Sequence, residues 1–157
     1  MGAIEDLEKR IRILEDIEEI KKMKSRYVYC LDERDWDGVL NYFTEDVKAD
    51  LGPNGKFKGK KELRKFFKED YPPATSFSLH MTQDPLIEIN GDKAKGRWYL
   101  HTSATFTKNN QASWGAVRYD DEFVKEKGKW KCSSLILTIY YMTSYEEGWV
   151  KRKMLDM

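Results

Sequence analysis

The most restrictive feature of this 157-residue chain is a run of alternating apolar and polar residues from about residue 75 to residue 145. Such alternation is typical of β-strands that bury one face. Short turn-forming sequences divide the run, and we predict hairpin turns at Asn90-Gly91-Asp92 and at Lys127-Gly128. The pattern therefore predicts four long antiparallel strands, over residues 75–89, 93–107, 113–125 and 129–145.

The residues before this region follow a helical pattern. Apolar side chains recur every three or four positions, which predicts one long helix with one apolar face. These side chains are Ile4, Leu7, Ile11, Leu14, Ile17, Ile20, Met23, Tyr27 and Leu31. The part from Ile4 to Leu14 is close to a heptad pattern, so it could pack on its own domain or on a second subunit. The basic run from Lys21 to Arg26 is predicted to lie in solvent.

Shorter elements connect the helix to the strands. Asp35 is predicted to cap a second helix over residues 36–43, and a first strand follows over residues 44–51. A helical pattern from Lys60 to Tyr71 is expected to end at Pro72-Pro73. Helices first and strands later indicate an α+β fold. We predict a cone-shaped, curved antiparallel sheet packed around the long N-terminal helix, with room for a ligand at its mouth.

Composition narrows the class of protein. Twenty-eight Lys and Arg residues against 27 Asp and Glu residues give a net charge of +1, which provides no electrostatic footprint for nucleic acid or an acidic membrane. The acidic run Asp120-Asp121-Glu122 is predicted to be a solvated edge. Cys30 and Cys132 lie in apolar surroundings without metal-ligand spacing. We therefore expect a single cytoplasmic domain over residues 1–157, with no metal and no cofactor.

Polar residues near the end of the long helix and on one strand are candidates for a site. His80 lies on the polar face of its predicted strand, where it is either a structural or surface residue or a base. His101 falls on the odd-numbered face of the next strand and is expected to point outward if the even-numbered face lines the cavity. Asp32 could simply terminate the helix. Tyr27 lies on the apolar stripe and could be a packing residue.

Three stretches carry a resemblance to a known family. They are the motif Tyr-x-x-x-Leu-Asp-x-x-Asp-Trp-Asp from residue 27, Ser78-Leu79-His80-Met81, and Gly96-Arg97-Trp98-Tyr99-Leu100. With the order of elements, they resemble the SnoaL-like branch of the nuclear transport factor 2-like (cystatin-like) α+β barrels. Within that branch the chain looks most like bile-acid 7α-dehydratases, and it is also similar to scytalone dehydratase.

The resemblance implies catalytic roles for Tyr27, Asp32 and His80. In the bile-acid enzymes an aspartate stands where this chain has Thr102, and an arginine stands near the place of Thr138. The outer polar groups therefore differ, and the difference bears on the substrate more than on the reaction type.

Removal of water next to a carbonyl needs a base for the proton and a group that binds or protonates an oxygen. We expect a cofactor-independent, dehydratase-like lyase or isomerase that acts on a hydrophobic cyclic ketone such as a steroid or polyketide. His80 would be the base, Asp32 would orient it, and Tyr27 would bind or protonate an oxygen. Substrate-binding candidates are Trp98, Tyr140, Trp114 and Thr102.

Two alternatives stay open. One is a non-catalytic ligand-binding or assembly module, and the other is a polyketide cyclase that uses the same groups to close a ring. The expected partners are a small hydrophobic substrate and further copies of the chain in a homodimer or homotrimer, with no nucleic acid and no membrane.

Overall fold

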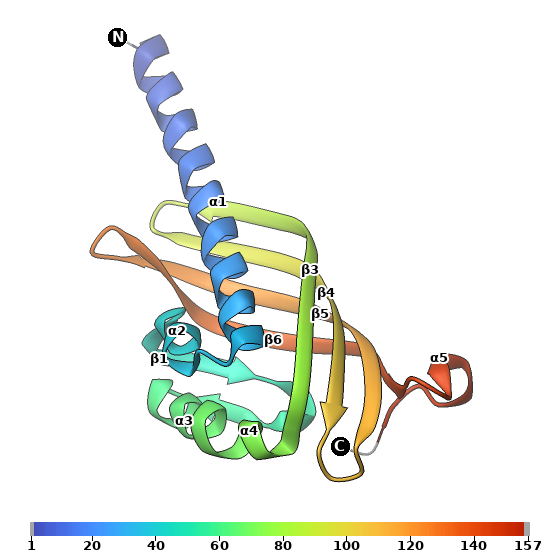
Figure 1. The fold of residues 1–157 in the computed structure, drawn as a ribbon. Coiled ribbons are helices and arrows are strands. Elements are labelled where there is room, and N and C mark those ends of the chain that lie inside the picture. Colours follow the sequence, from blue (N-terminus) through green and yellow to red (C-terminus); the bar gives the residue numbers. More distant parts are fainter. Residues whose placement is uncertain (1, 156–157) are drawn as a thin grey trace.

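The computed structural model describes residues 2–155 and confirms the α+β prediction. Helix α1 (Gly2–Glu33) packs across one face of a single curved, open sheet (Figure 1). The strands lie in the order β2-β1-β6-β5-β4-β3, and their bounds are β1 (Phe43–Asp50), β2 (Lys56–Lys58), β3 (Thr75–Asn90), β4 (Lys93–Phe106), β5 (Gln111–Glu126) and β6 (Lys129–Ser144). No helix within residues 2–155 has the length and apolar character needed to cross a membrane.

The four long strands β3 to β6 pair antiparallel in sequence order, as the alternating pattern predicts. On β4, even-numbered residues such as Trp98 and Leu100 are buried, whereas Tyr99 and His101 are exposed. We call the face that carries Trp98 and packs against α1 the inner face, and the opposite one the outer face. Strand β1 runs parallel to β6, a pairing that the sequence pattern did not predict.

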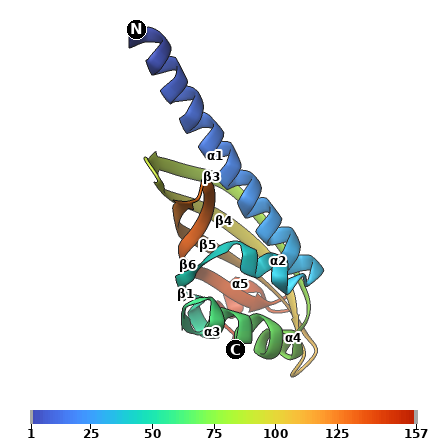
Figure 2. The same ribbon diagram turned by 90° about the vertical axis from the view of Figure 1, so that its left-hand side faces the viewer.

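The prediction of a single apolar face along α1 is wrong. Its apolar positions recur about every 3.4 residues, whereas an α-helix has about 3.6 residues per turn, so the stripe winds round the helix. Ile4 and Leu31 are about seven and a half turns apart and lie on opposite sides. The sheet buries the second half of the stripe, including Ile20, Tyr27 and Leu31. The first turns of α1 project beyond the sheet (Figures 1 and 2).

Short helices connect α1 to the long strands and follow the last of them. Helix α2 (Trp36–Asn41) is capped by Asp35, whose carboxylate accepts from the Gly38 N–H at 3.0 Å, as predicted. The remaining short elements are η1 (Gly52–Asn54), α3 (Lys60–Lys65), the π-helical turn η2 (Phe66–Asp70), α4 (Tyr71–Ala74) and α5 (Gly148–Lys151).

The predicted helix stop at Pro72-Pro73 is also wrong, because both prolines lie in the first turn of α4. Residues 60–74 are helical without a break through α3, η2 and α4, and the run ends at Ala74, one residue after the second proline.

Gly96 on β4 is predicted to be intolerant of any side chain. A Cβ atom at this position would lie 2.4 Å from two ring carbons of Trp98 and 3.0 Å from Phe123. We expect Gly96→Ala to lower the free energy of unfolding by about 1–3 kcal/mol, because the Trp98 ring has to move within a packed core. Urea denaturation measures this loss. The control is Gly2→Ala, which meets nothing within 4 Å; equal stability of the two variants would contradict the prediction.

Candidate functional site

The end of α1 and the edge strand β3 bring Asp32 and His80 together. Asp32 Oδ1 lies 2.6 Å from His80 Nδ1, and the His80 backbone N–H donates to both carboxylate oxygens at 3.1 and 3.2 Å. A carboxylate only accepts hydrogen bonds, so the neutral imidazole carries its hydrogen on Nδ1 and keeps the lone pair on Nε2. The two side chains are 17% and 13% exposed, which leaves this pair, the Asp32–His80 dyad, partly open to a ligand.

The position of β3 explains how one carboxylate can hold both the ring and the backbone of His80. Strand β3 pairs only with β4 and forms an edge of the sheet, so alternate backbone N–H groups have no strand partner. The end of α1 covers this edge, and Asp32 fills the vacant acceptor position. Arg34, which follows α1 with a φ of 59°, adds a second connection by donating to the Thr75 carbonyl. The dyad is therefore fixed by backbone as well as side chains.

Thr102 joins the dyad on the inner face. It is the register partner of His80 on β4, and it is buried. Side chains of directly opposed residues lie about 4.5–5.5 Å apart at Cβ, so the Thr102 hydroxyl is a neighbour of the imidazole. Of the predicted site residues, the structure thus places Asp32, His80 and Thr102 together.

Tyr27, on α1, packs over a different part of the inner face. Asp32 and Tyr27 are roughly 140° apart round the helix, from about 100° per residue. The Tyr27 ring is buried and stacks on Tyr42 with centroids 4.4 Å apart, and its hydroxyl is hydrogen-bonded to Tyr119. Tyr27 is thus packed into the core beside Tyr119.

Tyr119 contacts Tyr27 and also feels the charge of Asp32 in the dyad. Burial raises the pKa of the Tyr119 hydroxyl most strongly, and the charges of Asp121 and Asp32 raise it further. The hydrogen bond with Tyr27 lowers this pKa and so opposes the rise. Tyr119 therefore lies beside Tyr27 and within the electrostatic reach of Asp32. The alternation of Tyr119 with Val117 and Asp121 predicted it as a possible cavity wall, but not its contact with Tyr27.

A buried ion pair lies beneath these tyrosines. Lys24 Nζ donates to Asp121 Oδ2 at 2.7 Å, and the side chains are 1% and 0% exposed. The Tyr42 hydroxyl donates to the same oxygen at 2.7 Å. Burial lowers the pKa of Lys24 and raises that of Asp121, while their mutual attraction opposes both shifts. The predictions that the Lys21–Arg26 run and the 120–122 run are both solvated are therefore wrong at Lys24 and Asp121.

Aromatic rings enclose the ammonium group of Lys24. Its Nζ lies 3.3 Å from the centroid of the Tyr119 ring and 5.2 Å from that of Trp98. Such contacts stabilise a cation that has left water. Trp98, which we predicted to bind substrate, thus packs in this buried cluster. The sequence contained a signal for Lys24, because it follows Ile20 by four residues and precedes Tyr27 by three on the buried side of α1.

Trp114 and Tyr140, the other predicted cavity residues, lie on the outer face. Trp114 packs with Tyr141, Tyr145 and Trp149, with its ring centroid 5.0 Å from that of Trp149. Tyr140 is the extra residue of a bulge in β6, because Val117 pairs with Ile139 and Ala116 pairs with Tyr141. Its hydroxyl accepts from Arg118 at 3.2 Å. Neither residue faces the dyad.

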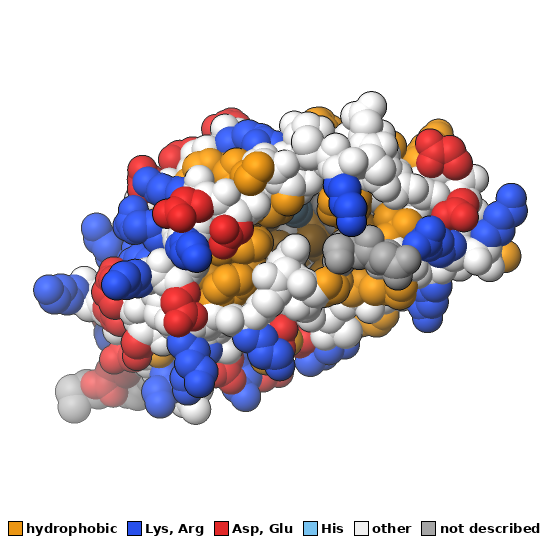
Figure 3. Space-filling model, turned by 90° about the horizontal axis from the view of Figure 1, so that it is seen from below, with side chains coloured by type: hydrophobic (Ala, Val, Ile, Leu, Met, Phe, Trp, Pro, Cys, Tyr) orange, Lys and Arg blue, Asp and Glu red, His pale blue; other side chains and the backbone are white. Residues whose placement is uncertain are grey.

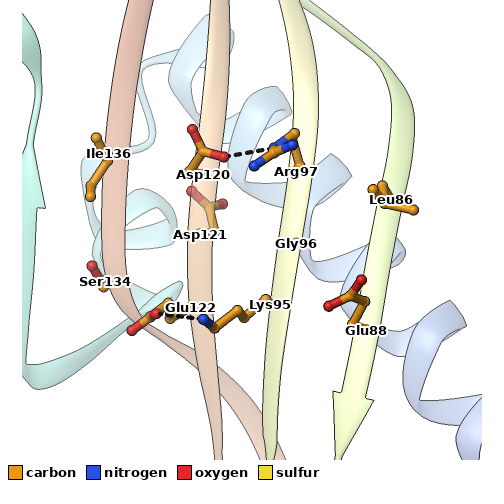
Figure 4. Close-up of a pocket in the computed structure, with 10 residues that line it drawn as sticks. All are labelled: Leu86, Glu88, Lys95, Gly96, Arg97, Asp120, Asp121, Glu122, Ser134 and Ile136. Atoms are coloured by element: carbon orange, nitrogen blue, oxygen red, sulfur yellow. Dashed lines mark hydrogen bonds and ion pairs between the residues drawn. The ribbon is translucent and has the colours of Figure 1, made fainter.

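The outer face also carries a shallow hollow of about 470 Å³, shown in Figure 4. Arg97 Nε donates to Asp120 Oδ1 at 2.7 Å, and Lys95 lies 3.7 Å from Glu122. Arg118 binds the second oxygen of Asp120 at 2.8 Å. These charges are paired with one another, so the hollow does not present a concentrated charge of one sign.

A second hollow, of about 500 Å³, opens at the end of the molecule opposite the N-terminus (Figure 3). Phe66, Tyr71, Phe106 and Leu155 are among the residues that line it, together with Thr75 at the start of the strand that carries His80. Tyr71 also contributes to the raised pKa of Tyr119, after burial and Asp121 and before Asp32. Tyr71 thus lies both in this hollow and within electrostatic reach of Tyr119.

Comparison with known protein families shows the family to which this chain belongs. A model of the SnoaL-like domain matches residues 12–136. The chain belongs to the SnoaL-like family. The matched segment begins within α1 and includes the dyad and most of the sheet.

Solved structures similar to this SnoaL-like chain show the same fold. A hexachlorocyclohexane dehydrochlorinase of LinA type 2 aligns with a TM-score of 0.81 and 20% identity, over 86% of this chain and 92% of that one. LinA type 3 from Novosphingobium barchaimii LL02 gives 0.80 and 20%, over 86% and 93%. A proposed scytalone dehydratase from Novosphingobium aromaticivorans gives 0.77 and 23%, over 84% and 89%. At these identities the likeness concerns the fold.

Proposed function

We propose that this SnoaL-like protein is a cofactor-independent lyase that removes a proton and a neighbouring leaving group from a hydrophobic cyclic substrate. The observation that carries the proposal is the 2.6 Å contact between Asp32 and His80, which leaves Nε2 as a free base. Dehydratase and dehydrochlorinase names among the structural neighbours agree with an elimination.

For a cyclic β-hydroxy ketone, the proposed reaction needs only groups of this chain. His80 Nε2 takes the proton from the carbon next to the carbonyl, and the C–H electron pair delocalises into the carbonyl as an enolate. The enolate then re-forms the carbonyl and a new C=C bond as the hydroxyl leaves from the neighbouring carbon. The imidazolium returns its proton to that hydroxyl, so water departs and His80 is neutral again. Asp32 stabilises the imidazolium between the two steps.

We assign the oxygen-binding role to the Tyr27–Tyr119 hydroxyl pair. The two hydroxyls are hydrogen-bonded to each other, and a phenol hydroxyl of such a pair can donate to a developing oxyanion. The hollow of about 500 Å³ that includes Phe66, Tyr71 and Phe106 is the proposed entrance, and these aromatic side chains favour a ring-shaped, hydrophobic substrate such as a steroid or polyketide ketone.

The proposal predicts product formation from a panel of such compounds. Purified protein is incubated with cyclic β-hydroxy ketones of increasing size and with a chlorinated cyclohexane. We expect the conjugated enone, or the chloride, from at least one member, without added metal or cofactor. Binding of panel members without turnover, at protein concentrations comparable to substrate, would instead favour a non-catalytic binding module.

A further inference from the structure

The projecting part of α1 carries an apolar stripe that faces away from the domain. Ile4, Leu7, Ile11 and Leu14 are 70%, 52%, 53% and 65% exposed. From about 100° per residue, the centre of this stripe lies roughly 140° round the helix from the side that packs on the sheet. We call these four residues the seam. Figures 1 and 2 show the helix continuing well past the sheet at this end.

The spacing of the seam is that of a coiled coil. With Ile4 as position a of a heptad, isoleucine occupies both a positions and leucine both d positions. Isoleucine at a with leucine at d favours two parallel strands. The folded domain already holds the rest of α1 as a helix, so these two heptads extend an existing helix and do not have to nucleate a new one.

The charges beside the seam also distinguish the two possible orientations. Arg10 is at position g and Glu15 is at position e of the next heptad. In a parallel pair, position g of one helix meets the following position e of the other. Arg10 of each copy would therefore face Glu15 of the other copy. In an antiparallel pair, Arg10 would approach Arg10 and Glu8 would approach Glu8. Charge complementarity therefore favours the parallel arrangement.

We propose that this chain forms a two-fold dimer through a parallel coiled coil of its projecting α1 segments, with a second copy of itself as the partner. Because the sheet lies roughly 140° away from the seam round α1, the two domains splay to opposite sides and do not collide. The apolar seam ends at Leu14, since the next a and d positions are Glu18 and Lys21. The coiled coil thus stops near the point where each helix joins its own sheet.

The test is the solution mass of the full-length chain, measured by sedimentation over a concentration series. Wild type is expected to have twice the mass of one chain. The variant with Leu7→Glu and Leu14→Glu is expected to associate at least about 100-fold more weakly, because four buried leucines per dimer are lost. The matched control is Lys9→Glu, which lies on the far side of the same segment. Thermal unfolding checks that the domain is intact.

Charge-exchange variants and cysteine variants fix the orientation. Arg10→Glu and Glu15→Arg should each weaken the dimer several-fold, and the double exchange should restore it. Leu7→Cys should form an intermolecular disulfide, because identical d positions face each other only in the parallel pair, whereas Lys9→Cys should not.

A monomeric wild type would overturn the proposal. So would a dimer that survives both seam substitutions, since the contact would then lie elsewhere, for example on the outer face of the sheet. Failure of the Leu7→Cys cross-link in a seam-dependent dimer would overturn the parallel orientation.

Discussion

Replacement of His80 by glutamine is expected to lower kcat by about 10²–10⁴-fold on any substrate that wild type converts, because the only proposed base is removed. Asp32→Asn should lower it to a comparable degree. An asparagine can bind the ring but does not stabilise the imidazolium that forms when Nε2 takes the proton. Both substitutions keep most of the side-chain volume, so the melting temperature should fall far less than activity does. Steady-state kinetics with parallel thermal unfolding separates the two effects.

His101→Gln is the matched control for His80→Gln. His101 is the other histidine of the chain, lies on the neighbouring strand, and is exposed on the outer face. Its replacement should leave kcat and KM unchanged. If His80→Gln and Asp32→Asn both retain wild-type activity while folded, the dyad is not the catalytic centre and the proposed mechanism fails.

The second large effect concerns stability. Lys24→Met is expected to reduce the free energy of unfolding by about 3–5 kcal/mol, because it leaves the buried Asp121 carboxylate without its cation. Asp121 Oδ1 already has no hydrogen-bond partner among the described residues. The double variant with Lys24→Met and Asp121→Asn should recover part of the loss, since the remaining amide is neutral and still accepts from Tyr42. Urea unfolding of wild type, both single variants and the double variant gives the coupling energy.

The loss in Lys24→Met should depend on pH. Burial already raises the pKa of Asp121 in the folded state, and removal of Lys24 takes away the main opposing charge. A carboxyl whose folded pKa lies above its unfolded value of about 4 destabilises the fold at higher pH and ceases to do so as pH falls below that value. We therefore expect the deficit relative to wild type to be largest near neutral pH and to shrink on acidification.

Lys125→Met provides the contrast. Lys125 Nζ also joins the sheet to α1, at 2.5 Å from Asp16 Oδ1, but these side chains are 24% and 16% exposed. Its removal should cost less, about 1 kcal/mol, because both side chains keep part of their hydration and Asp16 still accepts from Trp130 Nε1. Equal losses at Lys24 and Lys125, or strictly additive effects of the Lys24 and Asp121 substitutions, would contradict the account of a desolvated, coupled pair.

Local pattern predicted the fold well where one periodicity holds. The period of two in residues 75–145 predicted the four long strands and put His80 on the strand face opposite Leu79 and Met81. It did not show which face is the inner one, because the apolar Leu79 and Met81 are exposed and the face with His80 is turned inward. The motif that contains Asp32 marked the end of α1 correctly, because α1 ends at Glu33. What the sequence alone did not supply was long-range pairing, above all the parallel contact of β1 with β6 and the burial of Lys24 opposite Asp121.

Small phase differences account for the other discrepancies. A stripe that advances about 3.4 residues per step departs from the helix period and changes sides within 30 residues. Tyr140 follows Ile139, which pairs with the inward-facing Val117, so it lies on the outer face. The bulge there keeps Tyr141 on the same face. Trp114 lies on the outer face because the odd-numbered residues of β5 point inward. Such shifts depend on pairing across the sheet, which residue spacing along one strand does not encode.

The tautomer of His80 tests the central claim most directly. Nitrogen-15 NMR of protein labelled in its histidine rings distinguishes a hydrogen on Nδ1 from one on Nε2, and His80→Gln assigns the signals. The account predicts that neutral His80 carries its hydrogen on Nδ1, held by Asp32, and that Asp32→Asn weakens this preference. A neutral ring with its hydrogen on Nε2 in wild type would contradict it, because Nε2 could not then act as the base.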